Sequence, residues 1–158
     1  MTASTVPSAP VTELTEQARA WQHVSLAPDS AHAVAFRLDD ATLGVLHYDG
    51  LLEMPLPLPI GTILVEENLA LPDPERPDAH WVSTRLDAAD LRPATLLLRL
   101  SYLYRRLLRS PDPAVLQRIR TELDQYLLPP ALVGVYDAML AKRHRGGTPS
   151  SSAPNGHR

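Results

Sequence analysis

Residues 92–109 read RPATLLLRLSYLYRRLLR, and this stretch decides the class of fold. At 100° per residue, its apolar side chains gather within one arc of about 140° and its arginines fall opposite. The side chains in that arc are Leu96, Leu97, Leu100, Leu103, Tyr104, Leu107 and Leu108. Pro93 suits the first turn of a helix. The pattern predicts an amphipathic helix that covers a sheet, because burying seven such side chains provides on the order of 10 to 20 kcal/mol.

Alternation of apolar and polar residues before this helix predicts strands. The expected strands are residues 24–26, 32–38, 43–48, 51–54 and 80–86. Asp49 and Gly50 form the dipeptide that best suits a tight hairpin turn. Pro55, Pro57 and Pro59 remove every second amide donor, so this segment is expected at a sheet edge or in an extended polyproline-like path. Pro55 is expected to end an edge strand. The strands together predict an antiparallel meander.

Four further helices are expected along the chain. The expected helices are one capped by Thr12, one over residues 61–68, one that starts at Asp112 and Pro113, and one over residues 131–143. A proline-rich surface loop is expected over residues 71–79. The sequence therefore predicts an α+β fold, with an antiparallel β-meander sheet covered by an amphipathic helix and a helical C-terminal third.

Composition predicts how the chain is divided. Residues 1–10 and 146–158 are rich in proline, serine and glycine, which predicts a disordered leader and a disordered tail around a single domain over residues 11–145. The chain has no cysteine, which excludes disulfides, thiolate metal sites and a cysteine nucleophile. No apolar run reaches the length of a membrane span, so a cytoplasmic location is expected.

No phosphate-binding glycine loop and no histidine spacing typical of a metal site is present, so neither a cofactor nor a metal is expected.

The net charge of −3 conceals an uneven distribution of charged residues along the chain. Residues 1–90 hold 14 acidic and four basic residues, whereas residues 91–158 hold four acidic and 11 basic ones. The chain is therefore no overall polycation, and nucleic acid is not the first partner expected.

Four arginines of the long helix form a candidate partner-binding face: Arg99, Arg105, Arg106 and Arg109. Such a face is suited to a phosphate, an acidic protein or a second copy of the chain. A solvated helix face is the common alternative, and the same arginines could instead pair with the acidic N-terminal half, within the molecule or across a dimer. A non-catalytic interaction protein is therefore one of two functional hypotheses.

The other hypothesis concerns His47 and Glu53, which flank the predicted hairpin turn. Residues in these positions can be cross-strand neighbours. A carboxylate beside an imidazole orients the ring and favours its charged form, which is the minimal equipment of a general base. His47 and Glu53 are thus the candidate catalytic pair, and a polar pair on the solvent face of the sheet is the alternative.

Three segments resemble the luciferase-domain family, whose domain occurs in fungal luciferase and in small bacterial proteins. They are GVLHYDGLLEMPL at 44–56, HWVS at 80–83 and LLRLSYLY at 97–104, within a similarity that covers about residues 43–108. The resemblance implies binding of an apolar or aromatic small molecule, with His80, Trp81 and Tyr48 as candidate ligand contacts.

The resemblance also implies a cofactor-independent oxygenation of a polyphenolic pyrone. The family motif has histidine, aspartate and phenylalanine where this chain has Val45, Glu53 and Leu56. Because the motif's histidines are not all kept, ligand binding is the expectation and oxygenation is left open.

Overall fold

The computed structural model describes residues 6–76, 80–110 and 112–147 of the chain. Over these residues, one six-stranded sheet and five helices form an α+β structure, which confirms the predicted class. The elements are α1 (Ala9–Arg19), β1 (Val24–Ser30), β2 (Ala33–Leu38), β3 (Ala41–His47), β4 (Leu51–Pro55), α2 (Leu58–Glu66), β5 (Leu71–Pro72), β6 (Trp81–Arg85), α3 (Arg92–Arg109), α4 (Pro113–Asp124) and α5 (Pro130–Gly147). The strand order is β1-β2-β3-β4-β6-β5, and all neighbouring strands are antiparallel.

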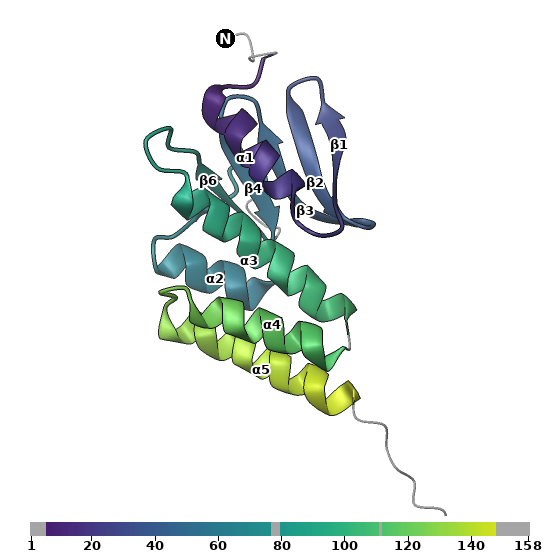
Figure 1. Cartoon of the computed structure of the whole chain (residues 1–158). Helices are drawn as coiled ribbons and strands as arrows, with labels where there is room; N and C mark the ends of the chain where they lie inside the picture. Colours follow the sequence, from purple (N-terminus) through teal and green to yellow (C-terminus); the bar gives the residue numbers. More distant parts are fainter. Residues whose placement is uncertain (1–5, 77–79, 111, 148–158) are drawn as a thin grey trace, which may run out of the picture.

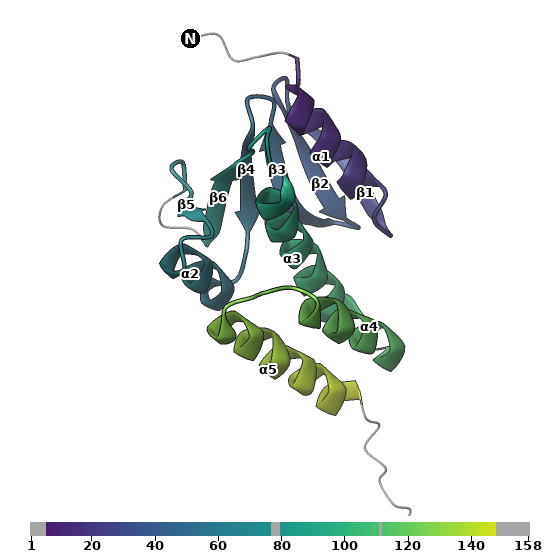
Figure 2. The ribbon, with the colours of Figure 1, turned by 60° about the vertical axis from the view of Figure 1, so that its left-hand side comes forward.

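The helices form layers on one side of the sheet (Figure 1). Helix α1 packs against β1, and α3 packs against β2, β3 and β4. Helices α4 and α5 contact α3 and each other on the side away from the sheet, as Figure 2 shows. Helix α3 is therefore enclosed between the sheet and a second helical layer.

Helix α3 has the predicted bounds, but it buries more of its surface than the predicted arc. Leu97, Leu100, Leu103 and Leu107 are buried as expected. Additional buried residues are Ala94, Leu98, Ser101 and Tyr102, whereas Leu96, Tyr104 and Leu108 are only half-buried. The additional residues face the sheet and the end of α1. Leu98 lies against Gly44, Ser101 is hydrogen-bonded to Leu43 of β3, and the Tyr102 ring contacts the Trp21 ring. Since α4 and α5 also contact this helix, it is buried on two sides, which a pattern with one apolar face does not predict.

The sheet and α3 lie close together at Gly44. A Cβ atom at this position would lie 3.1 Å from the Glu53 carbonyl oxygen, 3.1 Å from Leu98 Cδ1 and 3.3 Å from Met54 Cγ. One turn along the helix, the buried Ser101 hydroxyl donates a hydrogen bond of 2.7 Å to the Leu43 carbonyl of β3. Glycine and serine thus let the helix backbone lie against the strand.

The bounds of the N-terminal elements differ from the prediction. Helix α1 begins at Ala9, after Ser8 and with Pro10 in its first turn, and not at Thr12. Its start overlaps the end of the predicted leader. Strand β1 continues to Ser30, because it pairs with β2 along its whole length, with a bulge between Pro28 and Ser30.

The prediction of an edge strand before Pro55 is wrong. Strand β4 lies between β3 and β6, and Pro55 is its last residue, opposite Trp81. Pro59 lies in the first turn of α2, which begins at Leu58, three residues before the predicted start. The prolines end the strand and start the helix, so they remove no amide from the middle of the ladder.

Two further segments differ from expectation. Leu71–Pro72, predicted as part of a loop, forms the short strand β5 at the sheet edge beside β6. Helix α5 ends at Gly147, inside the predicted tail. Residues 1–5 and 148–158, which make up most of the predicted leader and tail, lie outside the described residues.

Among the described helices, none has the length and apolar character needed to cross a membrane.

The contact at Gly44 leads to a first prediction. Replacing Gly44 with Ala is expected to lower the free energy of unfolding by about 1 to 3 kcal/mol, because the added methyl group meets backbone and core atoms. Gly134→Ala is the matched control: this glycine lies in α5 with open space around it, so the change is expected to stabilise by about 0.5 to 1 kcal/mol. Urea unfolding of both variants tests this, and equal effects would contradict the close approach.

Candidate functional site

A polar cluster lies on the face of the sheet opposite α3. Along β4, Leu52 and Met54 face the main core, so Glu53 between them faces the other side. Its opposite residue on β6 is Ser83, which is also buried. The alternation of the strands therefore places a buried carboxyl group on the side of the sheet away from the main helical layer.

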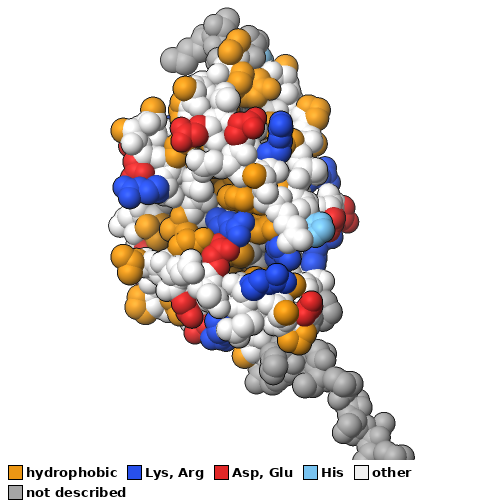
Figure 3. Space-filling view, in the orientation of Figure 1, with side chains coloured by type: hydrophobic (Ala, Val, Ile, Leu, Met, Phe, Trp, Pro, Cys, Tyr) orange, Lys and Arg blue, Asp and Glu red, His pale blue; other side chains and the backbone are white. Residues whose placement is uncertain are grey.

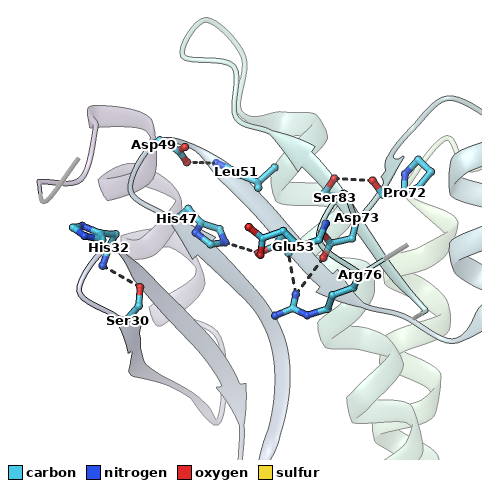
Figure 4. A network of polar contacts seen from close by, with 11 residues as sticks. Ser30, His32, His47, Asp49, Leu51, Glu53, Pro72, Asp73, Arg76 and Ser83 are labelled. Carbon is cyan, nitrogen blue, oxygen red and sulfur yellow. Dashed lines mark hydrogen bonds and ion pairs between the residues drawn. The ribbon is translucent and has the colours of Figure 1, made fainter. Parts of the chain in front are cut away.

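His47 and Glu53 are in contact, as the sequence predicts. Val45 is directly opposite Glu53 in the register of β3 and β4, so His47 is a diagonal neighbour. The turn between the strands has Gly50 at φ 101°, and the Asp49 carboxylate accepts a hydrogen bond from the Leu51 amide. The His47 Nε2 atom is hydrogen-bonded to Glu53 Oε1 (Figure 4). Their expected proximity is confirmed, whereas their catalytic role remains a prediction.

Two residues that the sequence analysis did not select complete the cluster. Asp73 and Arg76 follow β5 and reach Glu53 from the loop toward β6 (Figure 4). Arg76 Nη1 lies 3.2 Å from Asp73 Oδ2 and 3.4 Å from Glu53 Oε2. The other carboxylate oxygen of Asp73, Oδ1, accepts a hydrogen bond of 2.9 Å from the backbone amide of Glu75, which fixes the local turn.

Burial separates the cluster into an inner and an outer part. The side chains of Glu53 and Asp73 are 1% and 0% exposed, whereas those of His47 and Arg76 are 27% and 37% exposed. Two acids are thus enclosed in the protein, and the imidazole and the guanidinium that contact them reach solvent. Of these four side chains, those of His47 and Arg76 are accessible to a molecule in solution.

The two buried acids differ in their affinity for protons. Burial and hydrogen bonding with Asp73 raise the pKa of Glu53 above its ordinary value. Burial alone would also raise the pKa of Asp73, but hydrogen bonds with Glu53, the Glu75 amide and Arg76 together lower it. The pair therefore favours a protonated Glu53 beside an ionised Asp73, whose charge Arg76 balances.

This arrangement can exchange a proton with the surface. A neutral Glu53 donates its O–H to His47 Nε2, whereas an ionised Glu53 accepts an N–H from the same nitrogen. The proton can thus lie on either partner without a change in the total charge of the cluster. Such a pair is suited to acid–base chemistry or to binding an ionisable group.

Trp81 stacks beneath Arg76 in this cluster. The Cζ atom of Arg76 lies 4.0 Å from the centroid of the Trp81 ring, a cation–π distance. The half-buried ring packs against the small apolar residues Ala33, Ala35 and Val45 of β2 and β3. Trp81 therefore both covers this part of the sheet and supports the guanidinium that contacts the acids.

The other predicted ligand contacts lie apart from the cluster. Tyr48 follows His47 and packs against the main core, toward the opposite face. His80 is exposed, and within the described residues its side chain makes no hydrogen bond or ion pair that joins it to His47 or Glu53. The structure thus brings together His47, Glu53 and Trp81, but not Tyr48 and His80.

The predicted arginine face is largely used within the molecule. Arg99 forms two hydrogen bonds with Glu122 of α4, at 2.7 and 2.6 Å. Arg109 forms ion pairs with Asp39 and Asp40 in the β2–β3 turn. The contacts of Arg109 are of the predicted kind, in which arginines of the helix pair with the acidic N-terminal half within the molecule.

The remaining two arginines contact tyrosines of the same helix. Arg106 donates to the Gln22 side chain and to the Tyr102 hydroxyl, each at 3.0 Å, and Arg105 lies over the Tyr104 ring. The helix therefore presents few free guanidinium groups to a partner, which weakens the hypothesis of an interaction protein.

Comparison with known proteins identifies no relative: no family model, no curated protein and no solved structure matches the chain. Within residues 6–76, 80–110 and 112–147, no group of three or more histidine and acidic side chains is arranged to hold a metal ion. The observations that bear on function are therefore those on the side chains of the cluster around Glu53.

The pKa directions within the cluster lead to a second prediction. Because the pKa of Glu53 is raised in the folded state, its stabilising contribution is complete below pH 4.5 and is lost as the pH rises through the folded value. Glu53→Gln mimics the protonated acid, so its unfolding free energy relative to the wild type is expected to increase as the pH rises above 4.5.

Asp73→Asn is expected to show the opposite trend. The lowered pKa of Asp73 stabilises the fold above pH 3.8, and that stability is lost as the pH falls through the folded value. The wild type should therefore gain stability over Asp73→Asn as the pH rises from acid. Urea unfolding of the wild type and both variants between pH 3 and pH 8 measures the two differences in unfolding free energy. If both differences changed with pH in the same direction, the raised pKa of Glu53 and the lowered pKa of Asp73 would be contradicted.

Proposed function

We propose that the protein binds an apolar or aromatic small molecule that carries an acidic hydroxyl or carboxyl group, at the face of the sheet where His47 and Arg76 reach solvent. The observation that carries this proposal is the buried pair Glu53 and Asp73 beneath two partly exposed basic side chains. The ligand's acidic group would contact His47 and Arg76, and its body would lie beside the Trp81 ring.

The energetic cost of the buried acids supports a role beyond stability. Desolvating two carboxyl groups costs several kcal/mol, and apolar residues of similar size would often hold such a site equally well. Glu53 lies in an interior strand of the sheet, and its sequence neighbours Leu52 and Met54 are fully buried. An apolar side chain at position 53 would therefore suit the fold. Buried acids with shifted pKa values beside an exposed imidazole are characteristic of functional sites.

Charge supports an acidic ligand. The raised pKa of Glu53 favours its neutral form, and Arg76 balances the charge of Asp73, so both effects reduce the negative charge of the inner part of the cluster. His47 is hydrogen-bonded through Nε2 to the Glu53 carboxyl group, and when Nε2 accepts that bond its Nδ1–H can donate to an acidic group. The planar guanidinium of Arg76 adds hydrogen-bond donors that suit a carboxylate or a phenolate.

The resemblance to the luciferase-domain family also points to this face, since His47 belongs to the motif that carries the likeness. We do not extend the proposal to oxygenation. Val45 replaces the first histidine of that motif, and it is 3% exposed and packed with Trp81. The proposed role of His47 is therefore ligand contact and proton exchange.

The two tryptophans allow a direct test, because Trp81 lies beside the cluster and Trp21 lies at the end of α1. Phenylacetate is expected to shift the indole N–H NMR signal of Trp81, and to do so at lower concentration than the neutral probe 2-phenylethanol. Loss of a charged hydrogen bond costs about 1.5 to 3 kcal/mol, so His47→Ala should raise the Kd for phenylacetate about tenfold or more. The Trp81→Phe variant assigns the two signals.

His32→Ala is the control, since His32 precedes β2 and takes no part in the contacts that join His47 and Arg76 to Glu53. This variant should bind phenylacetate like the wild type. The proposal would be contradicted if phenylacetate left the Trp81 signal unchanged at millimolar concentration, or if His47→Ala and His32→Ala bound it equally well.

A further inference from the structure

A second candidate site lies on the other side of the sheet. An open cleft of about 1050 Å³ is bounded by α1, the segment 88–92, α3 and the end of α4. Figure 3 shows this side of the molecule, where acidic side chains over α1 are separated by hydrophobic surface from charged side chains over α3 and α4. None of the residues that line this cleft belongs to the cluster around Glu53.

The walls of the cleft are partly aromatic. Trp21, Leu96 and Tyr126 line it, and all three side chains are half-buried. The Trp21 ring also contacts the Tyr102 ring, with centroids 5.4 Å apart, so it is held in place. The cleft therefore offers fixed apolar surfaces to the body of a small molecule.

An ion pair forms the floor of the cleft. The Arg99 guanidinium lies 5.0 Å from the Trp21 centroid and 4.6 Å from the Tyr102 centroid, and it is hydrogen-bonded twice to Glu122. The Tyr126 hydroxyl donates to the same carboxylate at 2.5 Å. Burial and the Glu122 carboxylate raise the pKa of Tyr126 to about 12, so the phenol stays neutral. The charge of Arg99 is therefore matched within the protein.

Charge pairing leaves the cleft with an excess of negative charge. Arg92 is paired with Asp90 through two contacts of 2.9 and 3.1 Å, as Arg99 is with Glu122. Of the charged residues that line the cleft, Glu13 of α1 is the one without a partner in the described part of the chain. A cleft that is lined both by an unpaired carboxylate and by aromatic side chains is suited to a cation with an apolar body.

We propose that this cleft binds a small organic cation, whose positive group pairs with Glu13 and whose aromatic or alkyl body packs between Trp21 and Tyr126. Gln17 and Gln125, both exposed at the rim, supply amide oxygens to the remaining N–H groups of an ammonium or amidinium ligand. This site is independent of the one proposed at His47, because the two lie on opposite faces of the sheet.

The test compares three probes that share one phenyl ring and differ in charge: phenethylammonium, 2-phenylethanol and phenylacetate. Phenethylammonium is expected to shift the indole signal of Trp21 while leaving that of Trp81 unchanged. An exposed ion pair provides up to about 1 kcal/mol, so its Kd should be about three to five times lower than that of 2-phenylethanol. This advantage should shrink at high salt concentration.

The variants Glu13→Gln and Glu16→Gln form a matched pair on α1. Both residues are exposed, but Glu13 lines the cleft, whereas Glu16 does not and lies 3.8 Å from Arg19. Glu13→Gln should reduce the affinity for phenethylammonium to that for 2-phenylethanol, and Glu16→Gln should not. Thermal unfolding establishes that both variants keep the fold.

Three results would overturn the proposal: no shift of the Trp21 signal by phenethylammonium at millimolar concentration, tighter binding of phenylacetate than of phenethylammonium at Trp21, or equal binding of phenethylammonium by the two glutamine variants. None of them affects the site at His47, which is monitored through Trp81.

Discussion

The close contact between α3 and the centre of the sheet is the constraint on which the other elements depend. Gly44 leaves room for Leu98, and the Ser101 hydroxyl satisfies the Leu43 carbonyl in the same contact region. A larger residue at position 44 would meet backbone as well as side-chain atoms, so the helix could not keep this distance. The position of α3 then determines where α4 and α5 can pack, because both rest on its other side.

The same constraint separates two chemically different surfaces. Helices cover one face of the sheet, and their junction leaves the cleft whose floor is the Arg99 and Glu122 pair. The other face carries the acids Glu53 and Asp73, closed from solvent by His47, Arg76 and Trp81. One sheet therefore supports two proposed sites with opposite charge preference, and each has its own tryptophan beside it.

Electrostatics contributes to the assembly of the fold as well as to its sites. The acidic N-terminal half and the arginine-rich C-terminal half meet where Arg109 reaches the β2–β3 turn. Gln22 and Tyr102 hold Arg106 in a neighbouring contact. Contacts of this kind are individually weak when exposed, but they orient α3 along the sheet and leave few of its arginines free for a partner.

Local patterns in the sequence determined much of this structure. The bounds of α3, the hairpin turn at Asp49 and Gly50, and the proximity of His47 to Glu53 all follow from helical periodicity, turn chemistry and strand alternation. These signals act over a few residues, or across one tight turn, so they can be recognised without knowledge of the fold.

Tertiary structure alone decided the interior position of β4, the second buried side of α3, and the convergence of Asp73 and Arg76 on Glu53. Arg76 is 23 residues from Glu53 and lies in a proline-rich segment without periodicity, so no local signal marks the contact. The insertion of β6 between β4 and β5 brings that segment to the cluster. Strand order and contacts between distant residues depend on how the whole chain packs. They are determined by the burial of the complete hydrophobic core, and not by the pattern of any one segment.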